Sequence, residues 1–128
     1  DEVLYPDPGF PIYPSFTRGL GATAIPFRLL EKNRFQPDLA EISAKISPKT
    51  RVLIFNSPGN PTGNVMNLDA WRCLFELSDR HGFVIASDEC YSELYPDESA
   101  PPMGVLAAIL NYPIDDREVA RKPAAATA

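Results

Sequence analysis

The amino-acid sequence predicts an α/β fold built on a parallel sheet. Residues 51–55 (RVLIF) form a mostly apolar, β-branched run, which is typical of a strand buried on both faces of such a sheet. A helical pattern from Leu68 to His81 follows, and residues 83–87 form a second apolar run that we expect to be a buried strand. Strand, helix and strand in this order indicate a right-handed βαβ unit with two parallel strands.

Three further elements are expected before this unit. Residues 2–5 are a short strand candidate that a proline-rich stretch ends. Residues 13–20 are predicted to form a short helix, because Pro14 suits a first helical turn and the glycines at its end interrupt the pattern. Residues 22–27 alternate enough to form a second strand.

Two helices carry clear signals at their ends. Asp38 is expected to cap a helix at its N-terminus, and Asn67 is expected to do the same for the helix from Leu68 to His81. Gly82 supplies the stop of this second helix. The apolar stripe of the first helix comprises Leu39, Ile42 and Ile46. The inward face of the second is predicted to hold Leu68, Trp71, Leu74, Phe75 and Ser78.

The end of the chain differs in composition from the rest. Residues 1–110 are predicted to form part of one α/β domain. Residues 111–128 are charged, then rich in alanine and proline, and they lack apolar periodicity, so we expect a disordered tail. The first residue is Asp1 and a strand pattern begins at once, which favours a piece cut from a longer protein.

Composition excludes several classes of function. The 128 residues include 12 basic and 17 acidic side chains, and the net charge of −5 argues against nucleic acid or an anionic membrane as partner. No apolar run is long enough to cross a bilayer. Cys73 and Cys90 lie among apolar residues and are predicted to be buried thiols of a cytoplasmic protein. With His81 as the only histidine, no metal site is expected.

Polar side chains follow both strands of the βαβ unit. Asn60 and Thr62 lie in the NSPGNPTG segment after the first strand, and Asp88, Glu89 and Tyr91 come after the second. Because ligands bind outside the carboxyl ends of parallel strands, neighbouring strands would bring these side chains into one crevice. Two interpretations stay open: Asp88 and Tyr91 bind a ligand, or Asp88 caps a turn and Tyr91 packs against its neighbours.

Two more specific sequence patterns are not supported by the structure expected around them. Residues 19–24 fit the dinucleotide pattern G-x-G-x-x-A, but that pattern must follow a strand and open a helix, whereas here it follows a helix and opens a strand. Asp88 and Glu89 with Glu93 suggest a carboxylate pair for hydrolysis. Consecutive residues of an extended chain point to opposite faces, which weakens that interpretation.

Three sequence blocks together resemble a known family. In order and spacing, PDPGFPIYPSFTRGLGA, NSPGNPTG and ASDECYSELY resemble the class I/II aminotransferases, which are fold-type-I enzymes dependent on pyridoxal phosphate (PLP). The resemblance runs from about Asp1 to Met103 and implies a fragment of the large domain, part of a mostly parallel, three-layer sheet domain. The third block is similar in wording to the succinyldiaminopimelate and aspartate aminotransferase branches.

The resemblance implies roles for four residues. Asn60 matches the asparagine that donates to the phenolic oxygen of the cofactor, and its bond to the following proline is often cis in the family. Asp88 matches the aspartate that pairs with the pyridine nitrogen, and Tyr91 matches the tyrosine that hydrogen-bonds the phenolic oxygen. Phe10 matches the aromatic residue that stacks on the ring; the alternative for Phe10 is ordinary core packing.

The catalytic lysine of the family pattern is absent, so no catalytic residue is assigned. In the family, this Schiff-base lysine lies downstream in a Ser-x-x-Lys context. The arginine that binds the substrate carboxylate also lies downstream, and the loop that binds the cofactor phosphate lies upstream. The four lysines here, none in that context, are Lys32, Lys45, Lys49 and Lys122. This chain alone is therefore predicted to be inactive.

The resemblance implies a homodimeric parent enzyme that takes an amino acid and a 2-oxo acid as substrates. Two alternatives remain. One is a truncated, non-catalytic protein or interaction module. The other is a fragment of a PLP-dependent lyase, because several reactions share this fold.

Overall fold

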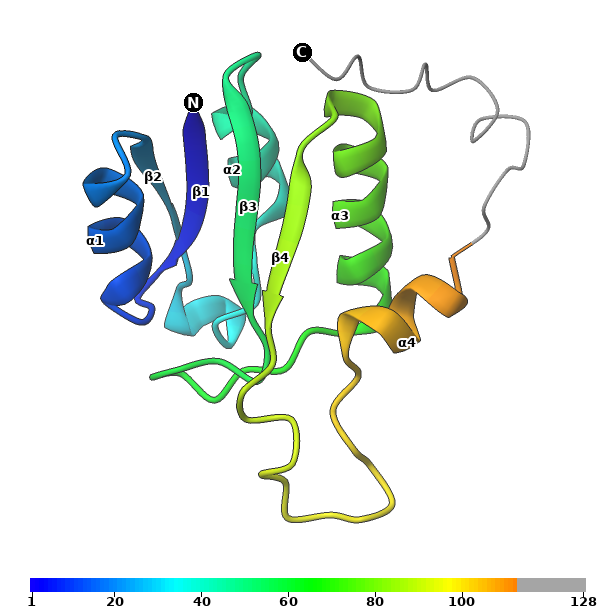
Figure 1. Ribbon diagram of the computed structural model, residues 1–128. Coiled ribbons are helices and arrows are strands. Elements are labelled where there is room, and N and C mark those ends of the chain that lie inside the picture. Colours follow the sequence, from blue (N-terminus) through cyan, green and yellow to red (C-terminus); the bar gives the residue numbers. More distant parts are fainter. Residues whose placement is uncertain (113–128) are drawn as a thin grey trace.

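The computed structural model describes residues 1–112, which form a four-stranded sheet with helices on both sides (Figure 1). All neighbouring strands are parallel, in the order β2-β1-β3-β4. The strands are β1 (Glu2–Asp7), β2 (Thr23–Arg28), β3 (Thr50–Asn56) and β4 (Val84–Asp88). The prediction of an α/β fold on a parallel sheet is confirmed.

The predicted βαβ unit is present with its expected caps. Helix α3 (Leu68–His81) joins β3 to β4, which pair in parallel. The Asn67 side chain accepts a hydrogen bond from the Ala70 amide at 2.9 Å, which satisfies one of the free N–H groups of the first turn. Gly82 ends the helix with a φ of 76°, a left-handed conformation that glycine adopts without a steric cost.

The other predicted elements are also found, with ends shifted by one or two residues. Helix α1 (Ile12–Gly19) separates β1 from β2, and α2 (Leu39–Lys45) is capped by Asp38, which accepts from the Ala40 and Glu41 amides. Two short elements were not expected from the sequence: a 3₁₀ turn, η1 (Glu31–Asn33), and α4 (Val105–Leu110). Helix α4 is apolar along its whole length, so its pattern shows no helical period.

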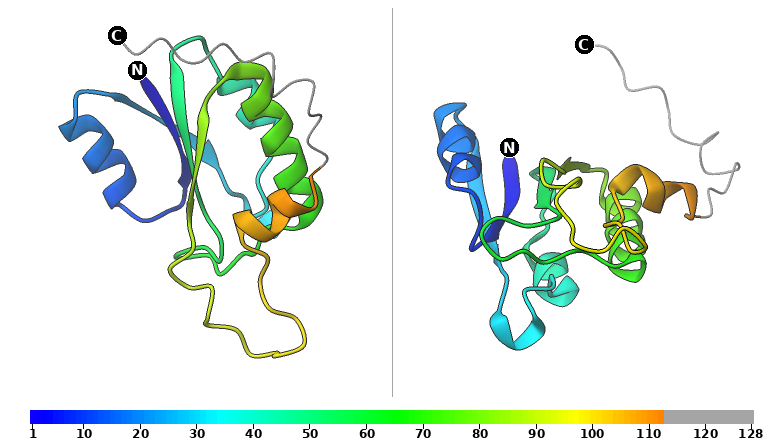
Figure 2. Two further views of the ribbon diagram at one scale, coloured as in Figure 1. Left: turned by 45° about the vertical axis from the view of Figure 1, so that its right-hand side comes forward. Right: turned by 90° about the horizontal axis from the view of Figure 1, so that it is seen from below.

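The helices divide between the two faces of the sheet. Figure 2 shows α2 and α3 on one face and α1 on the other. The core lies under α2 and α3, where Leu53 and Phe55 of β3 are fully buried. Adjacent aromatic rings run through it with centroids 5.3–6.1 Å apart. In spatial order these rings belong to Phe27, Phe55, Trp71, Phe75 and Tyr112.

The expected burial of β3 on both faces holds only in part, because Val52 and Ile54 are half-buried, and the edge strand β4 is not buried as predicted. Val84 of β4 is 64% exposed, and Ala86 of the same strand is also exposed. Side chains alternate along a strand, so one set faces α2 and α3 while the other faces the side of α1. Within the described residues, helix α1 packs mainly against β1 and β2, and its Tyr13 reaches Asp88 at the end of β4, so the middle of β4 stays exposed on that side.

The two cysteines are free, but their predicted burial holds only in part. Cys73 on α3 is half-buried, whereas Cys90 is exposed, because the chain has left the sheet at that point. None of the helices within residues 1–112 has the length and apolar character needed to span a bilayer. The tail was predicted over residues 111–128. Of these, Asn111 ends α4 and the Tyr112 ring packs against Phe75, while residues 113–128 lie outside the described residues.

Candidate functional site

The carboxyl ends of β3 and β4 are joined by one buried amide side chain. Asn56 is 4% exposed and stands opposite Asp88 in the strand register. Its Nδ2 donates to the Asp88 carbonyl at 2.9 Å, and its Oδ1 accepts from the Asn60 backbone N–H at 2.6 Å. Asn56 therefore fixes the loop that carries Asn60 relative to the strand end that carries Asp88. The sequence analysis missed this residue, because an asparagine at a strand end also suits a plain turn.

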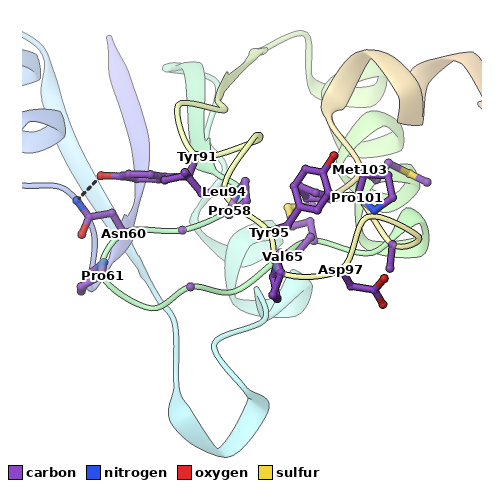
Figure 3. Close-up of a pocket in the computed structure, with 16 residues that line it drawn as sticks. Pro58, Asn60, Pro61, Val65, Tyr91, Leu94, Tyr95, Asp97, Pro101 and Met103 are labelled. Atoms are coloured by element: carbon purple, nitrogen blue, oxygen red, sulfur yellow. Dashed lines mark hydrogen bonds between the residues drawn. The ribbon is translucent and has the colours of Figure 1, made fainter.

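Asn60 and Tyr91 meet across the two loops that follow these strands. The Asn60 Nδ2 donates to the Tyr91 hydroxyl at 3.3 Å, as Figure 3 shows. The Asn60–Pro61 bond is cis, as the resemblance implied. An accepting tyrosine hydroxyl retains a proton of its own to donate. The pair thus places an amide donor and a phenolic hydroxyl side by side.

Asp88 faces the opposite side of the sheet from the core and binds Tyr13 of α1. Its Oδ2 accepts from the Tyr13 hydroxyl at 2.6 Å, and its Oδ1 accepts from the Cys90 amide at 3.2 Å. Asp88 therefore caps the turn after β4, as the second interpretation expected, and also holds a carboxylate oxygen toward α1; ligand binding by Asp88 and Tyr91 stays a prediction. Tyr13 was missed as a site residue, because 75 positions separate it from Asp88.

These contacts shift the acidity of both groups. Burial raises the pKa of Tyr13, and the hydrogen bond to the Asp88 carboxylate raises it further. Partial burial acts to raise the pKa of Asp88, but the hydrogen bonds from Tyr13 and from Cys90 together lower it by more, so the carboxyl has a pKa below its ordinary value. Asp88 is consequently ionised and Tyr13 neutral across the physiological range.

Replacing Tyr13 with phenylalanine should raise the pKa of Asp88 and destabilise the fold by about 1 kcal/mol. Hydrogen bonds to charged groups contribute about 1.5–3 kcal/mol, and solvent at the partly exposed carboxylate reduces this. The lowered pKa of Asp88 makes the contribution disappear as pH falls below about 4, and the raised pKa of Tyr13 makes it disappear as pH rises above about 10. Urea unfolding between pH 2 and 11 should show a constant difference from pH 5 to 9 only.

A carboxyl titration followed by NMR provides the direct check. The Asp88 resonance should titrate at higher pH in Tyr13→Phe than in the unmodified chain. An unchanged Asp88 titration would contradict the hydrogen bond, whatever the effect on stability.

Phe10 lies beside this pair but outside the core. Its ring contacts Tyr13 edge to face, with centroids 6.0 Å apart, and the side chain is 46% exposed. Ordinary core packing is therefore not what holds Phe10. The half-exposed ring, in contact with Tyr13, has surface free to contact another flat group.

Two polar residues expected in the same crevice face elsewhere. The Thr62 hydroxyl bonds the Asn64 side chain within its own loop. Glu89 turns toward α4, where it accepts from the Val105 amide at 2.6 Å. Of the side chains expected in one crevice, Asn60 and Tyr91 meet directly, Asp88 bonds Tyr13, and Thr62 and Glu89 face elsewhere.

A groove of about 830 Å³ opens between the two loops next to the Asn60–Tyr91 pair (Figure 3). Proline, tyrosine, methionine and other apolar side chains form most of its wall, including Pro58, Leu94 and Met103. Asp97 is the only charged residue along it, and its carboxylate is bonded to Ser99. Within residues 1–112, no group of three or more histidine, cysteine or acidic side chains is placed to hold a metal ion.

Comparison with known proteins identifies the family of this chain. A model of the family described as aminotransferase class I and II matches residues 1–114. The chain belongs to the class I and II aminotransferases. The enzymes of this family use pyridoxal phosphate.

Individual aminotransferases agree with the family match. The chain is 35% identical to an LL-diaminopimelate aminotransferase from Halothermothrix orenii over 102 residues, which are 80% of this chain and 26% of that enzyme. It is 30% identical to an alanine aminotransferase from Mycobacterium tuberculosis over 99 residues, which are 77% of this chain and 23% of that enzyme.

Solved aminotransferase structures share the fold. An aminotransferase from Neisseria meningitidis superposes with a TM-score of 0.79 at 37% identity over 86% of this chain and 28% of its own. A double mutant of Thermus thermophilus aspartate aminotransferase gives a TM-score of 0.78 at 31% identity, over 84% and 28%. This aminotransferase chain thus spans about a quarter of the length of its relatives.

Proposed function

We propose that the chain forms part of the cofactor-binding large domain of a PLP-dependent aminotransferase, which moves an amino group from an amino acid to a 2-oxo acid. The observation that carries this proposal is the placement of Asp88, Asn60 and Tyr91 at the carboxyl ends of two adjacent parallel strands. A homodimeric whole enzyme and a cytoplasmic location belong to the same proposal.

The donors and acceptors present fit the cofactor. An ionised Asp88 accepts a hydrogen bond from a protonated pyridine nitrogen and keeps that proton in place. Asn60 and Tyr91 both donate to an anionic phenolic oxygen, and Phe10 offers an exposed ring face. Bound PLP supplies an electron sink for the carbon that loses its proton. Tyr13 orients the Asp88 carboxylate by its 2.6 Å hydrogen bond.

The positions of the lysines within the described residues give no support for a covalent link between this chain and the cofactor. The Lys45 ammonium group binds Glu41 at 2.9 Å and also the Pro26 carbonyl, on the α2 side of the sheet. Lys32 and Lys49 are exposed, and Lys122 lies outside the described residues. Without an amine at the cofactor there is no positioned general base. We therefore expect residues 1–128 assayed alone to show no transaminase activity.

A titration with PLP tests the proposal. We expect saturable but weak binding to the unmodified chain, followed by protein and cofactor absorbance, and complete release on dialysis. Asp88→Ala should weaken binding about tenfold, because a hydrogen bond between charged groups in a partly buried site contributes about 1.5 kcal/mol. Asn60→Ala should weaken binding by a smaller factor.

A matched control separates the site from general loss of acidic charge. Asp97→Ala removes an exposed carboxylate near the same loops and should leave PLP affinity unchanged. Equal affinity of the unmodified chain and Asp88→Ala would favour a non-catalytic module instead. An absorbance change that survives dialysis and is lost in Lys122→Ala would show that this chain does carry a tethering lysine.

A further inference from the structure

Glu89 connects the end of β4 to the start of α4. Its Oε1 accepts from the Ser87 hydroxyl at 2.8 Å and from the Val105 backbone N–H at 2.6 Å. Val105 is the first residue of α4, whose N-cap, Gly104, has no side chain to satisfy the free N–H groups there. The Glu89 carboxylate thus takes the place of an N-cap side chain for α4, although it lies 16 residues away in the sequence.

The fit between Glu89 and Gly104 leaves no space for a larger residue. A Cβ at position 104 would lie 2.5 Å from the Glu89 Oε2 and 3.2 Å from its Cδ. The first separation is too short for a non-bonded contact, so an added methyl group would push the Glu89 carboxylate aside. Glycine at position 104 therefore lets the chain come close enough for the Val105 amide to reach the carboxylate.

Residues 90–103 form the loop that this contact closes. The loop leaves β4 directly after Glu89 and returns at Gly104, so one side chain holds both of its ends (Figure 1). It carries Tyr91, the hydrogen-bond partner of Asn60, and one wall of the 830 Å³ groove. Helix α4, at the far end, is fixed on α3, where Ala108 is fully buried.

We propose that Glu89 is a positioning residue that holds the 90–103 loop closed and thereby sets the Tyr91 hydroxyl against Asn60. This inference rests on the proposed function only for its effect on PLP, because the closure of the loop is a property of the fold itself. The two neighbouring carboxylates at the end of β4 have different partners. Asp88 binds Tyr13 and faces the candidate cofactor site, whereas Glu89 binds the Val105 amide and faces the 90–103 loop.

Hydrogen exchange in the full chain tests the closure directly. In Glu89→Ala, the Val105 amide loses its carboxylate acceptor and should exchange about tenfold faster. The Ser92 and Leu94 amides, which bond loop carbonyls, should also exchange faster, because the loop is no longer held shut. Amides in the centre of α3 should keep their rates. Glu89→Gln retains an acceptor for Val105 and should recover most of the protection, whereas Glu93→Ala, an exposed carboxylate of the same loop, should change nothing.

A double-mutant cycle identifies the contact itself. Gly104→Ala should speed exchange in the same amides, because the new methyl group displaces the Glu89 carboxylate. Combined with Glu89→Ala, it should add little, since the displaced group is already gone. Additive effects of the two changes, or unchanged exchange of Val105 in Glu89→Ala, would overturn the proposal.

The effect of Glu89 on PLP binding is measured in a separate experiment. Glu89→Ala should weaken PLP binding about threefold through Tyr91, and Tyr91→Phe combined with Glu89→Ala should weaken it no further than Tyr91→Phe alone. If the unmodified chain fails to bind PLP, the proposed function fails while the exchange experiment still decides the role of Glu89. A double variant that binds PLP more weakly than Tyr91→Phe alone would contradict the link through Tyr91.

Discussion

Replacing Trp71 with alanine is expected to lower the free energy of unfolding by about 3–5 kcal/mol, which is the usual cost of removing a large buried aromatic side chain. Trp71 is fully buried and lies between Phe55 and Phe75, with ring centroids 6.1 Å and 5.9 Å away. Trp71 lies on α3 and packs against Phe55 of β3, so its loss leaves a cavity between the sheet and the helix that connects β3 to β4. The indole Nε1 has no hydrogen-bond partner among residues 1–112, which favours the lower end of this range.

Urea unfolding followed by circular dichroism measures this effect. A small domain is stable by only about 5–15 kcal/mol, so Trp71→Ala should be close to unfolded at 37 °C. The control is Val84→Ala, at a position on β4 that is 64% exposed; it should cost less than about 1 kcal/mol. Similar losses for both variants would contradict the location of the core under α2 and α3.

Gly59→Ala is expected to disturb the Asn60 loop and to destabilise the chain by about 1–3 kcal/mol, as overpacking of a tight site does. A Cβ at position 59 would lie 2.3 Å from the Asn64 Oδ1 and 3.3 Å from the Asn56 carbonyl oxygen. Asn64 is 7% exposed and bonded to Thr62, so its short side chain has little room to move away. The displaced loop carries Asn60 out of reach of Tyr91, and PLP affinity should fall by more than it does in Asn60→Ala.

The matched control makes the same change where space is free. Gly19 lies at the end of α1, and a Cβ added there would meet no atom within 4 Å. Gly19→Ala should therefore leave PLP binding unchanged and stabilise the chain by up to about 1 kcal/mol through helix propensity. Equal behaviour of the two alanine variants in unfolding and PLP titrations would show that the Asn60 loop tolerates a side chain at position 59.

Local patterns in the sequence were enough for most of the fold. The run at residues 51–55, the caps at Asn67 and Gly82 and the run at residues 83–87 each act within a few residues, and together they specified a parallel βαβ unit. The same local logic placed Asn60 and Asp88 at neighbouring strand ends. The short helix α4 was missed, because six consecutive apolar residues carry no helical period.

Contacts between distant residues were decided by the tertiary structure alone. The bond from Tyr13 to Asp88 spans 75 positions, and that from Asn60 to Tyr91 spans 31, so no local pattern encodes either partner. Exposure of Val84 and Cys90 depends on which helices cover the second face of the sheet and where the chain leaves it. The sequence by itself determined which backbone segments form and in what direction they pair, because those choices rest on local hydrogen bonding and periodic burial. Only the packing of α1 and of the two loops decided which polar side chains meet at the strand ends, because meeting requires close approach in space rather than proximity along the chain.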